Sequence, residues 1–169
     1  MHIRTATPLD AQSIGDIRVA AWKHAYREFM PAEFLDSLDP SANLDALRSA
    51  LQSNPQPFHM TVAEVDDACV GFSIIGKPRY QAPESVAELW AINVYPTHWR
   101  GGVGRRLVSE ALAQARVKGI SAVELWCIEG NSPAARLYEM IGFQATGLSK
   151  TTSGLTGRPL TELAYQYAL

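Results

Sequence analysis

A stretch of ten residues, HWRGGVGRRL at positions 98–107, holds three glycines and three arginines. It follows an apolar run at 88–94 and leads directly into a segment with helical periodicity. The first amides of a helix have no partner within the helix, and the helix dipole is positive at that end. Glycines let an anion approach the backbone, and arginines add charged donors. This combination predicts a binding site for a phosphate group at the start of the helix.

Other readings of the same stretch are weaker. It could be a tight turn beside a solvated group of arginines, and the P-loop pattern GxxxxGK[ST] is absent. The dinucleotide pattern GxGxxG matches only at Gly102 and Gly104, because Leu107 stands at the third glycine. Glu124 has the spacing of the ribose-binding acid, but it falls inside the apolar run 122–128. The chain after Gly104 is also too short for the rest of a doubly wound sheet.

The segments around the glycines predict the elements that must position them. Alternating apolar residues predict strands, and apolar residues three or four apart predict helices. The expected strands are 2–6, 60–65, 68–76, 86–94, 122–128, 143–152 and 160–169. The expected helices run from Pro8 to about Tyr26, in two pieces between Pro31 and Ser53, from Val103 to near Gly119, and from Ser132 to Gly142. This order predicts an α/β protein with a mixed sheet and helices on its faces.

Length and charge limit the class of protein. With 169 residues, the chain is expected to form a single domain over residues 1–169. The net charge of −2 disfavours a nucleic-acid partner or an anionic membrane surface, so any attraction for anions must be local. No apolar run reaches membrane-spanning length, and the first ten residues lack the apolar centre of a signal peptide. A cytoplasmic protein is therefore expected.

The cysteines and histidines show no spacing typical of metal ligands. Cys69 and Cys127 lie far apart in the sequence and are interpreted as small buried hydrophobes in a reducing compartment. His24, His59 and His98 are interpreted as surface or packing histidines. No metal site is predicted.

Two motifs carry a resemblance to a known family. The first is INVYPTHWRGGVGRRL at 92–107, in which Gly102 and Gly104 match the loop pattern [QR]-x-x-G-x-[GA] and Trp99 departs from it at the Gln/Arg position. The second is EGNSPAARLYEMIGF at 129–143, which matches a signature at Asn131, Ala134, Tyr138, Gly142 and Phe143. With both motifs in this order, the chain resembles the GNAT superfamily of acetyl-coenzyme A-dependent N-acetyltransferases over nearly its whole length.

The resemblance implies a GNAT-like fold, with a mixed, mostly antiparallel sheet of about seven strands flanked by about four helices. It implies transfer of an acetyl group from acetyl-CoA to a primary amine by direct attack, without a metal. The alternative is a sensor or regulatory module that binds acyl-CoA without turnover. Small-molecule amines, antibiotics, amino acids and peptide amines all remain open as acceptors, and so does a homodimer.

The resemblance also implies which residues contact the cofactor. The pantetheine arm is expected along the main chain of Ile92, Asn93 and Val94, with the Asn93 amide as a candidate donor to the thioester oxygen. Asn131 is expected either to contact coenzyme A or to cap the helix that follows it. The pyrophosphate is expected on the amides of Arg100, Gly101, Gly102, Val103, Gly104 and Arg105.

Four further residues are assigned to the reaction. By the resemblance, Tyr138 protonates the leaving thiolate; its alternative role is helix packing. Glu88 is the candidate base, directly or through water, because a carboxylate among apolar neighbours is expected to have a raised pKa. Its alternative is a solvated acid at a strand edge. The resemblance also implies that Trp22 and Tyr26, four residues apart on a helix, line the acceptor pocket; their alternative role is simple core packing.

Overall fold

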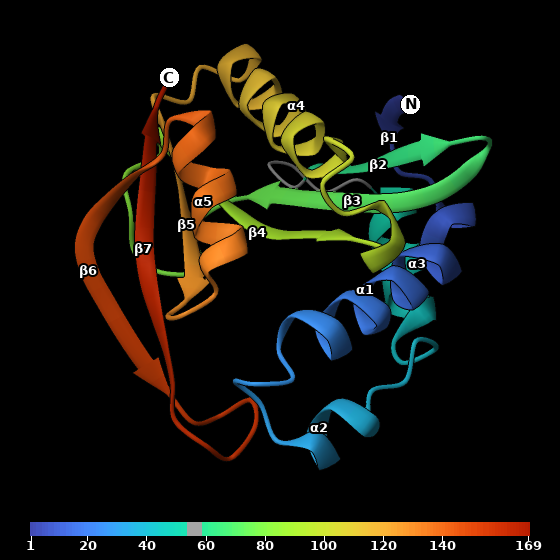
Figure 1. The fold of residues 1–169 in the computed structure, drawn as a ribbon. Helices are drawn as coiled ribbons and strands as arrows, with labels where there is room; N and C mark the ends of the chain where they lie inside the picture. Colours follow the sequence, from blue (N-terminus) through green and yellow to red (C-terminus); the bar gives the residue numbers. More distant parts are fainter. Residues whose placement is uncertain (54–58) are drawn as a thin grey trace.

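The sheet of this protein is mixed but mostly antiparallel. Within residues 1–53 and 59–169, which the computed structural model describes, seven strands form one sheet in the order β1-β2-β3-β4-β5-β7-β6 (Figure 1). They are β1 (His2–Thr5), β2 (His59–Val65), β3 (Ala68–Gly76), β4 (Val86–Val94), β5 (Ala122–Ile128), β6 (Gln144–Thr152) and β7 (Leu160–Ala168). Only β4 and β5 pair in parallel. The predicted fold class is confirmed.

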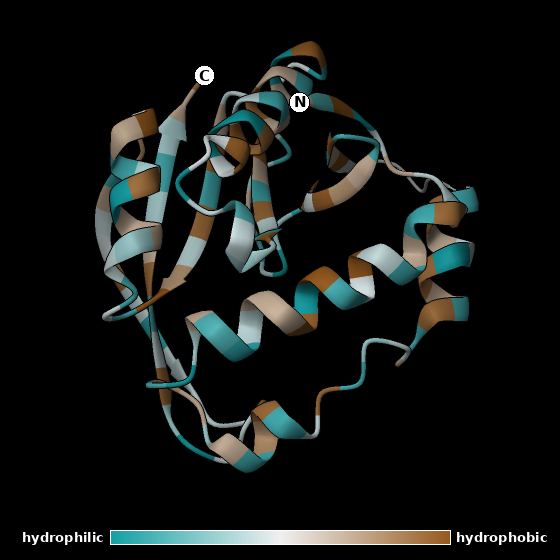
Figure 2. Cartoon of the chain, turned by 45° about the vertical axis from the view of Figure 1, so that its right-hand side comes forward, coloured by the Kyte–Doolittle hydropathy of each residue, from teal (hydrophilic) through white to brown (hydrophobic). Residues whose placement is uncertain are grey.

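Helices cover both faces of the sheet. They are α1 (Ala11–Ala25), α2 (Ala32–Asp36), α3 (Leu44–Ser53), α4 (Val103–Val117) and α5 (Ser132–Ile141). Neighbouring residues of β2 show the two faces, since Val62 packs in the cluster with α1 and Ala63 packs in the cluster with α4. Figure 1 shows α1 and α4 on opposite sides of this half of the sheet. Hydrophilic and hydrophobic residues both occur along these helices, as expected when one face packs on a sheet (Figure 2).

Local features of the sequence account for several turns and element bounds. Thr7 and Asp10 form a capping box at the turn Pro8–Asp10 that opens α1. Asp66 and Asp67, with φ of 50° and 61°, form the tight turn between β2 and β3. The strand expected at 122–128 has the bounds of β5.

The centre of the sheet separates between β4 and β5. The two strands pair only where Val86–Glu88 lies beside Ala122–Glu124, and beyond this they diverge (Figure 1). Along the other edge of β4, Ala91 pairs with Ile74 while Leu89 pairs with Ile75, so Trp90 is an extra residue. Such a bulge bends a strand and increases its twist. The edge of β4 from 89 to 94 therefore has no strand beside it on the β5 side.

The described residues contain no group of three or more His, Cys, Asp or Glu side chains that could hold a metal ion. None of the helices in this part of the chain combines the length and the apolar character that a membrane crossing requires. Cys127 is buried and Cys69 is half-buried, and both are free thiols.

Candidate active site

A glycine loop, residues 99–102, leads from the end of β4 into α4. Arg100 and Gly102 have φ of 62° and 81°, which places both in the left-handed region. Glycine adopts this conformation without a steric penalty, and Gly102 is the N-cap residue of α4. The glycine at this position therefore allows the chain to turn sharply into the helix.

The amides after this turn have no partner in the described part of the chain. The first main-chain hydrogen bond of α4 runs from the amide of Arg106 to the carbonyl of Gly102 at 3.1 Å, and the amides of residues 100–105 donate none. A Cβ atom on Gly102 would meet nothing within 4 Å. A row of free donors at a positive helix end, beside open space, is the geometry that binds phosphate.

Three arginines lie in or just after the glycine loop. Arg100, Arg105 and Arg106 are all exposed. Arg106 lines a shallow hollow together with Met1 and Ile3 at the edge of the sheet. Arg100 and Arg105 are therefore the arginines that remain as partners for a phosphate at the loop.

Trp99 fastens the glycine loop to two other elements. Its indole nitrogen donates to the carbonyl of Val94 at 2.7 Å. Its ring meets the ring of His24 on α1 edge to face, with 4.9 Å between the centroids. The indole has a single N–H, so this position has no donor left for a phosphate.

The open edge of β4 presents main-chain groups of alternate residues. The amide of Tyr95 donates to the carbonyl of Val70 on β3 at 2.8 Å. Since N–H groups alternate between the two edges of a strand, the amide of Asn93 also faces β3. The amides of Ile92 and Val94 face the gap between β4 and β5. The strand geometry therefore favours these two over Asn93 as donors to a ligand in the gap.

Tyr138 projects from α5 into the core below the diverging strands. It is 7% exposed, and its ring packs against Phe143 and Tyr165 at centroid distances of 5.9 and 6.3 Å. Burial raises the pKa of its phenol, and the nearby Cys127 and Tyr26 raise it further. The hydroxyl therefore stays protonated at neutral pH, as a proton donor must.

Glu88 is buried and paired with a cation. Only 1% of the residue is exposed, which rules out the solvated acid considered as its alternative. The main-chain amide of Arg79 donates to one carboxylate oxygen at 2.8 Å, and the guanidinium of the same residue donates twice to the other. The prediction from apolar sequence neighbours therefore missed a cation, which the loop between β3 and β4 supplies. Ala87 and Leu89 pack in the core on the α4 side, so Glu88 points to the α1 side.

Trp22 and Tyr26 lie next to each other at the end of α1. Their rings meet edge to face at 5.5 Å, and both pack against a cluster that includes Leu160 of β7 and Ile128 of β5. Burial raises the pKa of Tyr26 to about 12, and the nearby Cys127 and Glu162 contribute. The fold thus brings Tyr26 close to the surroundings of Tyr138, and core packing and pocket lining are compatible here.

Two more residues belong to the site: Asn131, which the sequence predicts, and Glu162, which it does not. Asn131 occupies the N-cap position of α5, but its side chain makes no capping hydrogen bond. Asn131 therefore begins the helix through its carbonyl, which accepts the amide of Ala135 at 3.1 Å, and not through its side chain. Glu162, which the sequence reasoning missed, lies opposite Ile128 in the sheet and forms an ion pair with Lys150 at 3.3 Å. Nothing in the local sequence marks Glu162, because the partner strand decides what it faces.

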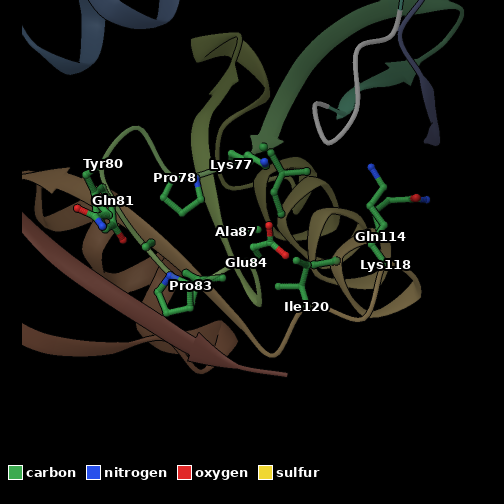
Figure 3. Close-up of a pocket in the computed structure, with 15 residues that line it drawn as sticks. Lys77, Pro78, Tyr80, Gln81, Pro83, Glu84, Ala87, Gln114, Lys118 and Ile120 are labelled. Atoms are coloured by element: carbon green, nitrogen blue, oxygen red, sulfur yellow. The ribbon is translucent and has the colours of Figure 1, made fainter.

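A separate cavity of about 550 Å³ lies near the far end of α4. Figure 3 shows Gln114, Lys118 and Ile120 on one side of it and Lys77, Pro78, Pro83 and Glu84 on the other. None of the predicted site residues lines this cavity. The glycine loop, rather than this cavity, is therefore the candidate site.

Comparison with known proteins identifies the family of this chain. The model of the acetyltransferase (GNAT) family matches residues 19–143. This chain belongs to the GNAT acetyltransferase family. A probable N-acetyltransferase of Mycobacterium tuberculosis, Rv2775, is 26% identical over 167 residues, which are 98% of this chain and 92% of that protein. The acyltransferase class expected from the sequence is confirmed.

Solved structures of GNAT proteins share the fold. The PaiA N-acetyltransferase of Thermoplasma acidophilum, solved with coenzyme A, has a TM-score of 0.77 at 20% identity and covers 99% of this chain and 98% of its own. YncA of Salmonella typhimurium, a putative acetyltransferase solved with acetyl-CoA, has a TM-score of 0.74 at 23% identity. It covers 99% of this chain and 93% of its own.

Proposed function

We propose that this GNAT protein transfers an acetyl group from acetyl-CoA to a primary amine by direct attack of the amine. The observation that carries the proposal is the row of unpaired amides at residues 100–105, directly beside the open edge of β4. The coenzyme A and acetyl-CoA bound to the two structural neighbours support the choice of cosubstrate. The thioester supplies an activated acetyl group.

The main chain around the glycine loop fits the cosubstrate. The amides of residues 100–105 would hold the pyrophosphate, with Arg100 and Arg105 beside it. The main-chain groups of Ile92 and Val94 would hold the pantetheine arm at the strand edge. The side chain of Asn131, which does not cap α5, is free to contact the same arm. The main-chain contact of Asn93 stays a prediction, and it is less favoured because the Asn93 amide faces β3.

Two side chains would move the protons of the reaction. Most alkyl amines are protonated at neutral pH, so one proton must leave before the nitrogen can attack. Glu88 would accept this proton through a water molecule at Oε2. This oxygen accepts only the amide of Arg79 and can accept one further hydrogen bond, whereas Oε1 already accepts two from the guanidinium. The hydroxyl of Tyr138 would give a proton to the departing thiolate.

The buried thiol next to these groups supports direct attack over an acyl-enzyme route. Cys127 lies among the site residues, but burial raises the pKa of its thiol to about 11. A thiolate is the reactive form, and only a minute fraction is present at neutral pH. Cys127 is therefore a poor candidate to take up the acetyl group itself.

Trp22 and Tyr26 would line one wall of the acceptor pocket, with Glu162 nearby. Small-molecule and peptide amines both remain candidates as acceptors. Two free cysteines in one chain favour a reducing compartment, so a cytoplasmic location is part of the proposal.

The test is a panel of primary amines with acetyl-CoA, followed by free-thiol release and by the mass of the product. We expect one equivalent of free thiol and a product about 42 Da heavier than the amine. This mass difference arises because an acetyl group replaces one hydrogen of the amine. If the protein binds acetyl-CoA but acetylates none of the amines, the sensor alternative replaces the enzyme.

A further inference from the structure

We propose that Trp99 is a positioning residue that couples the glycine loop to α1, so that coenzyme A binding orders the wall of the acceptor pocket. The inference rests on the proposed function, because it requires the glycine loop to bind the cofactor. Trp99 is 38% exposed, which is unusual for so large an aromatic ring without a role at the surface. It nevertheless makes two specific contacts with separate elements.

The first contact ties the glycine loop to the strand. The indole nitrogen donates at 2.7 Å to the carbonyl of Val94, which is the last residue of β4. The turn between them is closed by two main-chain hydrogen bonds, from His98 to Tyr95 at 2.8 Å and from Trp99 to Pro96 at 3.2 Å. This arrangement fixes the spacing between the strand edge and the loop amides, the two places expected to hold one cofactor molecule.

The second contact reaches the acceptor side. The His24 ring lies perpendicular to the Trp99 indole, at an angle of 89° and a centroid distance of 4.9 Å. His24 belongs to the last turn of α1. Trp22 and Tyr26 are each two positions away from it, and residues two apart on a helix point about 200° apart. Trp99 therefore holds α1 from one side while Trp22 and Tyr26 pack toward β5 and β7 on the other.

A cofactor bound to the loop amides would restrict the loop to one arrangement. Through the contact of Trp99 with His24, the same restriction would reach the last turn of α1. Coenzyme A should then slow hydrogen exchange both in the loop and at the end of α1. Removal of the His24 ring should interrupt only the second effect.

The test is hydrogen–deuterium exchange of the full chain with and without saturating coenzyme A. In the wild type, we expect slower exchange with coenzyme A in residues 99–106 and in residues 22–26. In His24→Ala, the loop should keep this protection and α1 should lose it. Lys23→Ala changes an exposed neighbour on the same turn and should behave as the wild type.

A second pair of variants separates the two contacts. Trp99→Phe keeps a ring for His24 but removes the donor to Val94, so coenzyme A should bind about 5- to 10-fold more weakly, the effect of one hydrogen bond. The protection of α1 should persist at saturation. His24→Phe keeps a ring at position 24 and should retain the α1 protection, even if His24→Ala proves too unstable to interpret.

The outcomes distinguish this inference from the proposed function. Loop protection without α1 protection in the wild type, or equal α1 protection in the wild type and His24→Ala, would overturn the coupling. Loss of the α1 protection in His24→Phe would overturn it as well. Absence of any coenzyme A binding would instead overturn the proposed cofactor site.

Discussion

The two ends of β4 contribute to the site by different means. At its C-terminal end, the strand and the glycine loop offer main-chain groups, and the first amides of α4 continue the row. At its N-terminal end, a single side chain, Glu88, is buried and held by Arg79. One end is built from backbone conformation, and the other from the pairing of a buried side chain with a residue of the preceding loop.

This difference decides how each end responds to change. Main-chain donors survive most substitutions, and they are lost only where a side chain alters the backbone or fills the space in front of it. A buried carboxylate depends on its partner, because an uncompensated buried charge is costly. The C-terminal end should therefore be sensitive at its glycines, and the N-terminal end at Glu88 and Arg79.

The largest effect is expected at the C-terminal end. Gly102→Val would strain a backbone with φ of 81° and place a side chain in the open space before the amides. The loss of several amide–phosphate hydrogen bonds should weaken acetyl-CoA binding by roughly 100-fold or more, measured by calorimetry. The matched control is Gly119→Val, at a left-handed glycine with equally open surroundings at the other end of α4. It should lower stability but leave acetyl-CoA affinity unchanged, and equal losses in both variants would contradict the amide site.

A large effect on turnover alone is expected for Tyr138→Phe. The variant keeps the buried ring and deletes the hydroxyl, so kcat should fall by about 100-fold, the usual scale for one acid–base group. Acetyl-CoA affinity should not change. Tyr165→Phe removes the hydroxyl of a neighbouring ring and should keep nearly full activity. Full activity of Tyr138→Phe with any active amine would remove this residue from the mechanism.

Glu88 and Arg79 test the side-chain end of β4 through the pH dependence of the rate. Glu88→Gln should weaken the ascending acidic limb of the profile, with activity recovering at high pH as more of the amine becomes neutral. Arg79→Gln should instead move this limb to higher pH, because a buried carboxylate without its cation is harder to ionise. An unchanged profile in Glu88→Gln would leave water or another residue as the base.

The smallest effect on activity is expected in the acceptor wall. Tyr26→Ala should raise the KM for the amine by about 10-fold, with little change for acetyl-CoA, and should lower the free energy of unfolding by about 3 kcal/mol. Leu35→Ala truncates a buried residue of the same cluster, so a similar loss of stability is expected without the change in KM. If the KM for the amine is the same in the two variants, Tyr26 belongs to the core alone.

The sequence predicts the backbone end of the site well because local rules govern it. The strand at 86–94, the glycines and the helix that starts at Val103 follow one another directly, so their spacing is visible in the chain. The left-handed turn at Gly102 is what a glycine at this position predicts. The short helix that begins at Ser132-Pro133 and ends before Gly142 is signalled in the same way.

What the sequence does not show depends on distant partners. Arg79 lies in a loop nine positions before Glu88, and no pattern marks it as the partner of a buried acid. The bulge at Trp90 occurs within a continuous apolar run, and only the pairing register with β3 reveals it. Asn131 stands where a helix cap is expected, yet its side chain makes no capping hydrogen bond.

The most direct test of the central claim is the melting temperature of the wild-type protein with and without millimolar acetyl-CoA. A ligand present at about 100 times its Kd stabilises the native state by about 2.7 kcal/mol. For a chain of this size, that amounts to an increase of roughly 5–10 °C in Tm. We expect this increase in the wild type and in Gly119→Val, and its loss in Gly102→Val. An unchanged Tm in the wild type would contradict the account.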